Sequence, residues 1–348
     1  MPDINKQFTK SKERVAHEVQ HGNQSFRLLH GRGKSYGEAF ETLCIDYFHP
    51  FIFVTVFRDF EPSLEEQVVV YLEELNALEG IDGVIVQIRR PLEIEADPSK
   101  RGHEQEQQPF FHFGDYVLHH DRNFLVFSNC EVERWFARFE NLRFKLSYDR
   151  QSIGYFLDSN PLKTWLRHAW EPQSHSASIL NTFSFTGGLG LSALKNPLLD
   201  DSAFLLNVDM SKGILKTAQT NFQLNKIDAK QYRNIAGDAR KICAQRQKLR
   251  IDQQFDLLIM DPPSFQKGSF DAQVDYIHCV KNLNGLLEER VTIAACLNNP
   301  QVTVEEFSDQ LKGLHSIGFS ESKVLPASED FPDISGHSAF KCIILQRD

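Results

Sequence analysis

The sequence lacks any apolar run of the length that a membrane helix needs, about 20 residues. Its first residues, Met1 to Lys12, are polar and contain no apolar signal core. We therefore expect a cytoplasmic protein that has no membrane partner.

Cysteine is scarce and scattered along the chain. The six cysteines form no CxxC pair, and none of their spacings is typical of a zinc site. Free thiols of this kind suit a reducing compartment, where a buried cysteine behaves as a small apolar side chain. We expect neither a disulfide framework nor a bound metal.

The chain also lacks an excess of positive charge. Its 47 acidic and 38 basic residues give a formal net charge of -9. Strong nucleic-acid binders usually carry a basic face, because contact with phosphates releases counterions. The overall balance argues against such a partner, but it does not exclude a local basic patch. The first 34 residues do carry seven lysines and arginines.

The length of 348 residues suggests about two domains at roughly 150 residues each, and 41% hydrophobic residues are ordinary for a globular protein. Composition and periodicity divide the chain into five parts. These are a polar N-terminal arm or isolated helix (1–25), a small α+β domain (26–95), a linker or exposed loop (96–109), an antiparallel β segment (110–150) and an α/β domain (151–348).

A basic turn, GRGKSYG at residues 31–37, lies near the start of the small domain. Glycine beside lysine and serine is reminiscent of a phosphate-binding loop, but the Walker spacing is absent. The composition therefore favours a solvated turn.

Strands and helices alternate after residue 151. The expected strands are 179–185, 203–209, 232–236 and 255–260, and the expected helices are 161–170, 189–194, 212–225 and 239–248. Such alternation predicts a parallel sheet covered by helices, in a Rossmann-like, doubly wound arrangement. Ligands bind at the carboxyl ends of the strands in sheets of this type.

The first candidate site segment is a glycine-rich loop between a strand and a helix. Phe185 and Thr186 lead into Gly187, Gly188 and Gly190. Glycine lets the backbone turn tightly and approach a ligand closely, although loops of this type have many uses.

Two acidic residues follow the next two strands. Asp209 lies 19 residues after Gly190, a spacing at which an acid binds both ribose hydroxyls of an adenosine. Asp238 is placed to receive an adenine amino group. Each acid has an alternative role as the N-cap of the helix that follows it. For the helix expected over 212–225, Ser211 is a second candidate for the cap.

The segment Asp261-Pro262-Pro263-Ser264-Phe265 follows the fourth strand directly and is the most specific of these signals. Two prolines fix the backbone after the strand, so Asp261 and the neighbouring carbonyl oxygens point into a cleft. Asp261 is then placed to contact the reacting centre, and Phe265 to cover it.

Five segments together resemble the class I S-adenosylmethionine-dependent methyltransferases. They are FSFTGGLGLSAL (183–194), VDMS (208–211), NFQLN (221–225), GDA (237–239) and MDPPSF (260–265). The resemblance is to the bacterial 23S ribosomal RNA large-subunit methyltransferases that act on cytosine C5. The N-terminal RNA-binding PUA module of that family is not evident here.

The resemblance implies S-adenosylmethionine as cofactor and RNA, in particular ribosomal RNA, as partner. The small domain would help to hold the RNA; a homodimer is not established. The resemblance places the glycine loop on the methionine part of the cofactor. It also implies a cofactor-binding role for residues adjoining the acids and for one residue before the loop: Met210, Ala239 and Asp158. The family's Gln-Arg after that aspartate is Ser159-Asn160 here.

Which atom of the base can be methylated depends on whether the protein supplies a thiolate. Cytosine C5 becomes nucleophilic only after a thiolate adds to C6, and the family supplies that thiolate from the strand after the Asp-Pro-Pro segment. Cys296 is the candidate, but the ungapped alignment places Ala295 at the nucleophile position, and a shift of one residue turns a strand side chain to the other face. Two interpretations of Cys296 therefore stay open, a nucleophile and a buried structural cysteine.

Other functions remain open as well. A base nitrogen needs no thiolate, and an Asp-Pro-Pro loop followed by an aromatic residue is compatible with N-methylation. A non-RNA acceptor fits the acidic composition, and a binding protein without catalysis fits the altered cysteine segment. His337 and Lys341 are expected in a loop before the last strand, either solvated or closing over the substrate.

Overall fold

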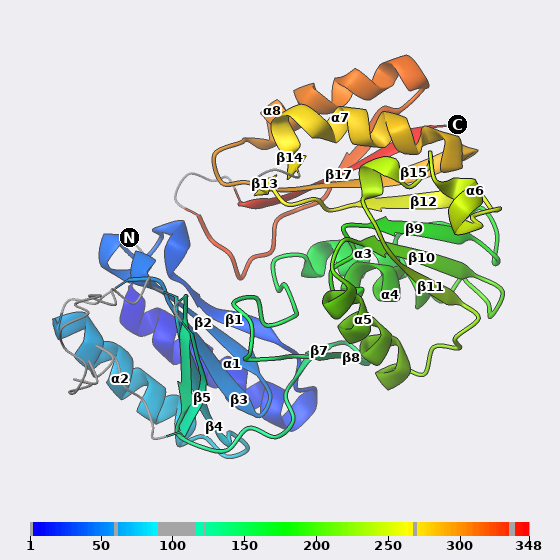
Figure 1. Cartoon of the computed structure of the whole chain (residues 1–348). Helices are drawn as coiled ribbons and strands as arrows, with labels where there is room; N and C mark the ends of the chain where they lie inside the picture. The colour runs from blue at the N-terminus through cyan, green and yellow to red at the C-terminus, as the bar shows by residue number, and fades with distance from the viewer. Residues whose placement is uncertain are drawn as a thin grey trace, which may run out of the picture. The chain divides into compact units, whose positions relative to one another are not determined.

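The computed structural model describes residues 3–58, 62–89, 116–121, 123–266, 270–333 and 338–347. The chain forms two compact units (Figure 1). Unit 1 contains Met1–Leu157 and Asp330–Gly336, and unit 2 contains Asp158–Glu329 and His337–Asp348. Within the described residues, no helix is both long and apolar enough to cross a membrane.

Unit 1 is built on a six-stranded sheet of order β1-β2-β3-β4-β6-β5. Its strands are β1 (Phe26–His30), β2 (Leu43–Phe48), β3 (Phe51–Val56), β4 (Gly83–Ile88), β5 (Tyr116–His120) and β6 (Leu125–Ser128). Only β3 and β4 pair in parallel, because helix α2 (Pro62–Asn76) carries the chain across between them. Two 3-10 helices, η1 (Gly31–Gly33) and η2 (Glu38–Thr42), join β1 to β2.

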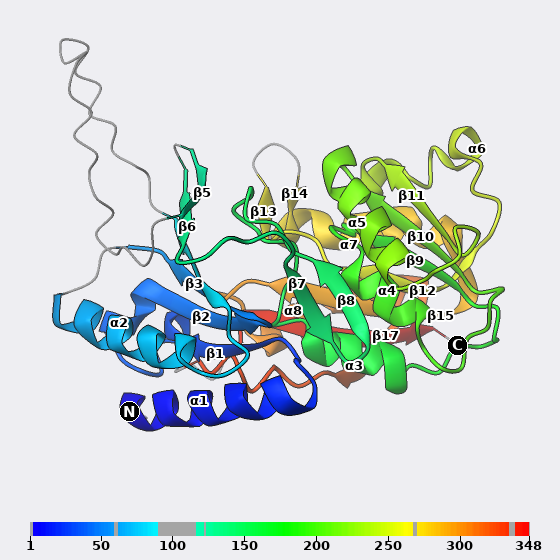
Figure 2. The same cartoon turned by 90° about the horizontal axis from the view of Figure 1, so that it is seen from below.

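The predicted polar arm is a helix, α1 (Ile4–His21), that packs on this unit. Phe8 and Val15 are buried along one face of the helix, and Phe8 stacks on Tyr71 of α2 with 3.9 Å between ring centroids. Figure 2 shows α1 and α2 on one face of the sheet. The arm therefore belongs to the core, because its few apolar residues share one helical face.

The other face of the sheet is covered by Trp135, which packs on Phe48 and Phe53. Part of the expected antiparallel β segment is a hairpin of β7 (Phe136–Phe139) and β8 (Leu142–Lys145), which turns at Glu140 with a positive φ of 50°. The expected linker, 96–109, lies outside the described residues.

Unit 2 is a seven-stranded sheet of order β11-β10-β9-β12-β15-β17-β16. Its strands are β9 (Ser178–Thr182), β10 (Phe204–Asp209), β11 (Tyr232–Ala236), β12 (Phe255–Met260), β15 (Leu287–Asn298), β16 (Ser320–Val324) and β17 (Phe340–Arg347), with a short β13 (Phe265–Gln266) and β14 (Phe270–Asp271) pair outside it. The first five pair in parallel, as predicted, while β17 runs antiparallel to its neighbours.

Helices cover both faces of this sheet (Figure 1). They are α3 (Asn160–His168), α4 (Gly188–Leu194), α5 (Lys212–Leu224), α6 (Arg246–Leu249), α7 (Ala272–Leu283) and α8 (Val304–Leu311), with 3-10 helices η3 (Ala239–Lys241), η4 (Asn284–Leu286) and η5 (Lys312–Ile317). The single helix expected over 239–248 is wrong, since only η3 and the four-residue α6 form there. The doubly wound arrangement itself is confirmed.

Candidate active site

The site lies where the strands of unit 2 end together. The parallel register pairs Thr182 of β9 with Val208 of β10 and with Met260 of β12, and Asp209 with Ala236 of β11. The loops that follow these four strands therefore start at one edge of the sheet. They contain the glycine loop, Asp209, Asp238 and the Asp-Pro-Pro segment.

The glycine loop is held in a strained shape. Phe183, Phe185 and Gly187 all have positive φ, at 52°, 48° and 79°. A Cβ on Gly187 would come within 2.9 Å of the Phe222 ring, so only glycine fits there. The amide of Asn221 on α5 donates to the carbonyl of Thr186 at 2.9 Å and fixes the loop from outside. Non-glycine residues at positive φ cost energy and cluster at functional sites.

Close packing of α4 on the sheet explains why residue 190 is a glycine. A Cβ there would lie 2.9 Å from both Asn181 Nδ2 and Leu205 Cδ1. Beneath it, Asn181 donates to Asn207, and Asn207 donates to Asn234, at 2.9 and 3.0 Å across three adjacent strands. The absence of a side chain therefore lets α4 pack directly on this buried amide row, and the predicted contact of Gly190 with the cofactor stays a prediction.

Asp209 organises the loop from the end of β10. Its Oδ2 accepts a hydrogen bond from the Phe185 amide at 2.9 Å, and its Oδ1 accepts one from the Ser211 amide at 2.8 Å. Ser211, not Asp209, caps α5, which removes the alternative role weighed for Asp209. Burial raises the pKa of Asp209, and the two amide donors oppose that rise. Each oxygen keeps a further lone pair for a ribose hydroxyl. Met210 beside it is 55% exposed.

Asp238 does cap a helix. Its carboxylate accepts from the Arg240 amide at the start of η3 and pairs with the Arg240 guanidinium at 2.8 Å. These hydrogen bonds lower the pKa of Asp238. Ala239 is buried in the core under η3. The expected contact of Asp238 with adenine remains a prediction, since the structure assigns this side chain a capping role.

The Asp-Pro-Pro loop is fixed at both ends. The Tyr276 hydroxyl donates to the carbonyl of Met260 at 3.1 Å, and the Ser264 hydroxyl donates to the carbonyl of Asn298 at the end of β15. Between these anchors, burial and the nearby Asp158 raise the pKa of Asp261 to about 7, while Lys163 lowers it. Phe265, after the prolines, is 69% exposed and is therefore free to meet a large planar ligand.

Lys163 is the residue that the sequence analysis missed. Its side chain on α3 is only 2% exposed, and its Nζ donates to Ser159 Oγ at 2.6 Å and Asn160 Oδ1 at 3.2 Å. Burial lowers the pKa of Lys163 to about 7, and Asp158 and Asp261 oppose that change. A lysine on an amphipathic helix usually faces solvent, so nothing in the sequence marked this one.

Asp158 belongs to the same group. Its Oδ2 accepts from Asn298 Nδ2 at 3.2 Å, which ties it to the strand end that also holds Ser264. The site therefore contains two carboxylates and one ammonium group under the Asp-Pro-Pro loop. Such a group of interacting charges titrates as a unit.

Of the two roles left open for Cys296, the nucleophilic one is not supported by its position. Cys296 is 0% exposed inside β15, and its Sγ lies 3.8 Å from the Sγ of Cys342, its partner in register on β17. Burial and the neighbouring Cys342 raise the pKa of Cys296 well above that of a free thiol. A nucleophilic cysteine needs the opposite, a lowered pKa and an open approach.

The loop expected before the last strand is only partly described. His337 lies outside the described residues. Lys341 is already inside β17 and buried, and its Nζ donates to the carbonyls of Asn299, Ser338 and Ala339 at 2.8, 2.6 and 3.3 Å. Lys341 thus ties the start of β17 to the end of β15 instead of standing in a solvated loop.

The described residues at this edge fit an adenosyl ligand that carries an amino-acid tail. Ser184 Oγ, in the glycine loop, is buried without a hydrogen-bond partner among the described residues. A buried hydroxyl without a partner is unfavourable, and a polar ligand in the loop would relieve it. Nowhere in the described part of the chain do three histidine, cysteine or acidic side chains gather as a metal site would require.

Comparison with known proteins decides the family. A family model described as S-adenosylmethionine-dependent methyltransferase matches residues 113–346. The chain belongs to this family. The methyltransferase is similar to the ribosomal RNA large subunit methyltransferase K/L of Shewanella loihica, with 34% identity over 151 residues, 42% of this chain and 19% of that protein. The chain spans less than half the length of the curated relatives that it matches.

Solved structures share the fold of the methyltransferase. SMU.776, described as a methyltransferase in complex with SAH, superposes with a TM-score of 0.74 at 18% identity, over 98% of this chain and 80% of its own. A SAM-dependent methyltransferase from Streptococcus mutans gives 0.70 at 16% identity, over 99% and 82%. The Rossmann-like fold and the cofactor, S-adenosylmethionine, are as expected from the sequence.

Proposed function

We propose that the methyltransferase transfers a methyl group to a nitrogen atom of a base in ribosomal RNA. The observation that carries the choice of atom is Cys296, which is buried in β15 with a raised pKa. Without a thiolate, cytosine C5 has no route to become a nucleophile. The names of the relatives, which act on ribosomal RNA, support the acceptor.

The chain's own residues would bind and orient the reactants. Asp209 would hold the ribose hydroxyls of the cofactor, and the loop from Ser184 to Gly187 would face its amino-acid part. When bound, S-adenosylmethionine supplies a methyl group on a positively charged sulfur that needs no further activation. Catalysis is then chiefly alignment of the acceptor with that methyl group.

Asp261 would receive the base. Its carboxylate accepts a hydrogen bond from the acceptor amine and thereby aims the nitrogen lone pair. The nitrogen would take the methyl group in exchange for its proton, the carbon–sulfur electrons remaining on sulfur, and Asp261 would accept that proton. A pKa of about 7 suits a proton acceptor at neutral pH. The exposed Phe265 would stack on the base.

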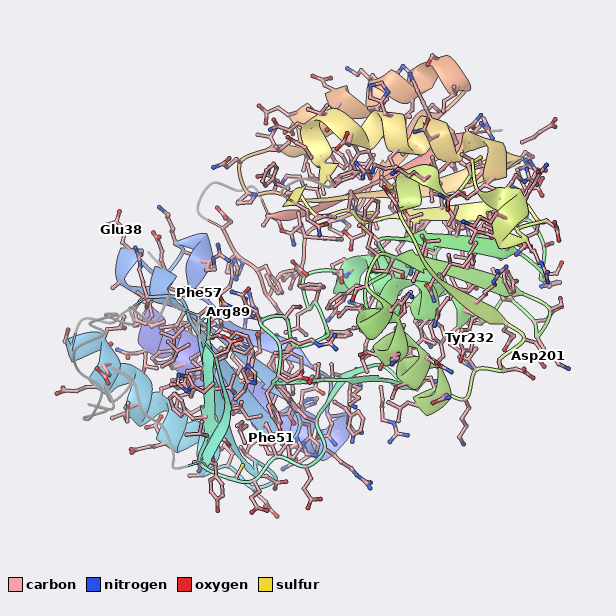
Figure 3. All side chains as sticks on the ribbon, in the orientation of Figure 1. Glu38, Phe51, Phe57, Arg89, Asp201 and Tyr232 are labelled. Carbon is pink, nitrogen blue, oxygen red and sulfur yellow. The ribbon has the colours of Figure 1, made fainter. Side chains whose placement is uncertain are left out.

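The test is transfer of labelled methyl from S-adenosylmethionine to protein-free ribosomal RNA. We expect label in RNA with the natural protein, and loss of it in Asp209→Ala together with loss of cofactor binding. Asp201→Ala is the matched control, because this exposed carboxylate lies at the opposite edge of the sheet, before β10 (Figure 3). Cofactor binding without any label in RNA would contradict the RNA acceptor.

A further inference from the structure

A second group of residues gathers at one edge of the unit 1 sheet. Because β1 and β2, and β2 and β3, are antiparallel while β3 and β4 are parallel, strands β1, β3 and β4 all end at this edge. The residues that follow them are Arg32, Phe57 and Arg89. Figure 3 labels Phe57 and Arg89 beside each other at this edge.

Both arginines lie over the same aromatic ring. The Cζ of Arg32 is 4.7 Å from the centroid of Phe57, and the Cζ of Arg89 is 5.7 Å from it. Arg89 also donates to the side chain of Gln87 and to the carbonyl of Gln151. A ring positions a guanidinium group but does not neutralise it. Neither arginine has an ion pair among the residues that the structure describes.

The turn that carries Arg32 is fixed by close packing. A Cβ on Gly31 would lie 1.8 Å from the carbonyl oxygen of Phe40, and one on Gly33 would lie 1.9 Å from that of Pro332. The basic turn that the sequence predicts to be solvated is therefore a rigid support, while the Arg32 side chain itself is exposed.

The surroundings leave positive charge in excess. Asp46 accepts two hydrogen bonds from Arg27, at 2.7 and 3.0 Å, and His30 accepts a third from the same guanidinium at 2.9 Å. Burial, Arg27 and Arg32 lower the pKa of His30 to about 3, against the opposing charge of Asp333, so His30 is neutral.

The positive charges of the arginines at this edge also repel one another. Burial, together with the neighbouring Arg32 and Arg27, lowers the pKa of Arg89 to about 10, and the carboxylate of Asp46 opposes that change. On the flank, Lys34 and Arg58 share the single carboxylate of Glu41 at 3.1 and 3.3 Å. An anion at this edge would relieve that repulsion.

We infer that Arg32 and Arg89, held on Phe57, bind a phosphodiester group of an RNA strand. Guanidinium groups match phosphate oxygens with paired hydrogen bonds and lose little hydration in doing so. The inference rests on the proposed function for the identity of the strand. It gives unit 1 a definite role in holding RNA, and it does so despite the net charge of -9.

The experiment measures binding of a fluorescently labelled single-stranded RNA oligonucleotide to the full chain over a series of KCl concentrations. In the double variant Arg32→Gln, Arg89→Gln, we expect the slope of log Kd against log salt to fall by about 0.7 for each phosphate that the protein no longer neutralises. We also expect Kd to rise by about tenfold for each arginine. Arg32→Lys keeps the charge and should keep the slope.

Arg134→Gln is the matched control, because it removes an exposed arginine from the same unit and should leave the slope unchanged. A double variant that is folded and binds cofactor, yet shows the slope of the natural protein, would overturn the site while leaving RNA methylation intact. No binding of RNA by the natural protein would also overturn it. Failure of methyl transfer alongside the expected decrease in slope would instead refute the proposed function and keep the site.

Discussion

Asp261, Asp158 and Lys163 show how burial and charge set the chemistry of single residues. Burial alone would keep both Asp261 and Lys163 neutral, since it disfavours the charged form of each. Their mutual attraction works the other way and brings both pKa values to about 7. The group can therefore hold or release a proton at neutral pH with little cost.

Replacement of Lys163 tests this coupling through the pH profile. If Asp261 accepts the proton, transfer should increase as the pH rises through about 7, where its carboxylate forms. Lys163 stabilises that carboxylate, so Lys163→Met raises the pKa of Asp261 and moves the acidic limb of the rate profile to higher pH. Lys163→Arg retains the charge and should leave the limb in place. An unchanged midpoint in Lys163→Met would contradict the coupling.

Cys296 provides the second test at this scale. Because its thiol is buried and protonated beside Cys342, Cys296→Ala should leave the rate of methyl transfer to RNA within about twofold of the natural rate. The smaller side chain should lower the free energy of unfolding by about 1 kcal/mol. Cys342→Ala removes the opposite thiol and serves as control. If a folded Cys296→Ala protein transferred no methyl group while Cys342→Ala remained active, Cys296 would have to be the nucleophile.

The sequence predicted the positions of some of these residues and not of others. The spacing from Gly190 to Asp209 and the position of Asp261 follow from the order of strands, so both were predicted. Lys163 was not, because its burial depends on how α3 packs. The Gln-Arg of the family is Ser159-Asn160 here, and these two side chains accept hydrogen bonds from Lys163. The positive charge next to Asp158 therefore comes from Lys163 on α3 and not from an arginine at position 160.

The packing of α4 on the sheet depends on the absence of a side chain at Gly190. Gly190→Ala would bring a methyl group within 2.9 Å of Asn181 Nδ2 and Leu205 Cδ1, both in buried strands. We expect the helix to shift and the free energy of unfolding to fall by about 1–3 kcal/mol.

Gly237→Ala is the control for this stability measurement, because a Cβ there has only ordinary contacts, the nearest at 3.7 Å. Urea unfolding of both variants gives the comparison. Equal stabilities for Gly190→Ala and Gly237→Ala would show that the glycine is not needed for packing.

Elements with strong periodicity were predicted well, and elements that depend on tertiary contacts were not. Tyr232–Ala236 and Phe255–Met260 are strands with the predicted bounds. Phe255–Met260 is almost entirely apolar, and turn residues follow both strands. Residues 239–248 have a helical composition, but only η3 and the four-residue α6 form there. The burial of α1 needs Tyr71 of α2, which lies far away in the sequence.

At the scale of the molecule, the chain enters unit 1 a second time. The segment from Asp330 to Asp333 contacts the first helix and the first turn of unit 1. Asp330 forms an ion pair with Arg14, and the backbone of Asp333 forms an isolated antiparallel β-bridge with Lys34. Phe331 lies under Arg27, with 4.4 Å from Cζ to the ring centroid, and beside His30. Unit 1 is therefore completed by residues that follow most of unit 2 in sequence, which strand periodicity could not reveal.

Phe331→Ala tests this completion. Removal of the ring abolishes a cation–π interaction and should destabilise unit 1 by about 1 kcal/mol. Hydrogen exchange should accelerate in peptides that cover β1 and β2, while peptides from β9 and β10 provide the internal control. Equal acceleration in both units, or none in either, would contradict a local role for this segment.

We propose a base nitrogen, and not cytosine C5, as the atom that receives the methyl group. The most direct measurement is the identity of the methylated nucleoside, obtained by digesting RNA methylated by the natural protein and by Asp261→Asn and analysing the nucleosides by mass spectrometry. We expect an N-methylated base whose amount is strongly reduced in Asp261→Asn. Methyl found on cytosine C5 would contradict the proposal and would require a thiol nucleophile that the buried Cys296 does not provide.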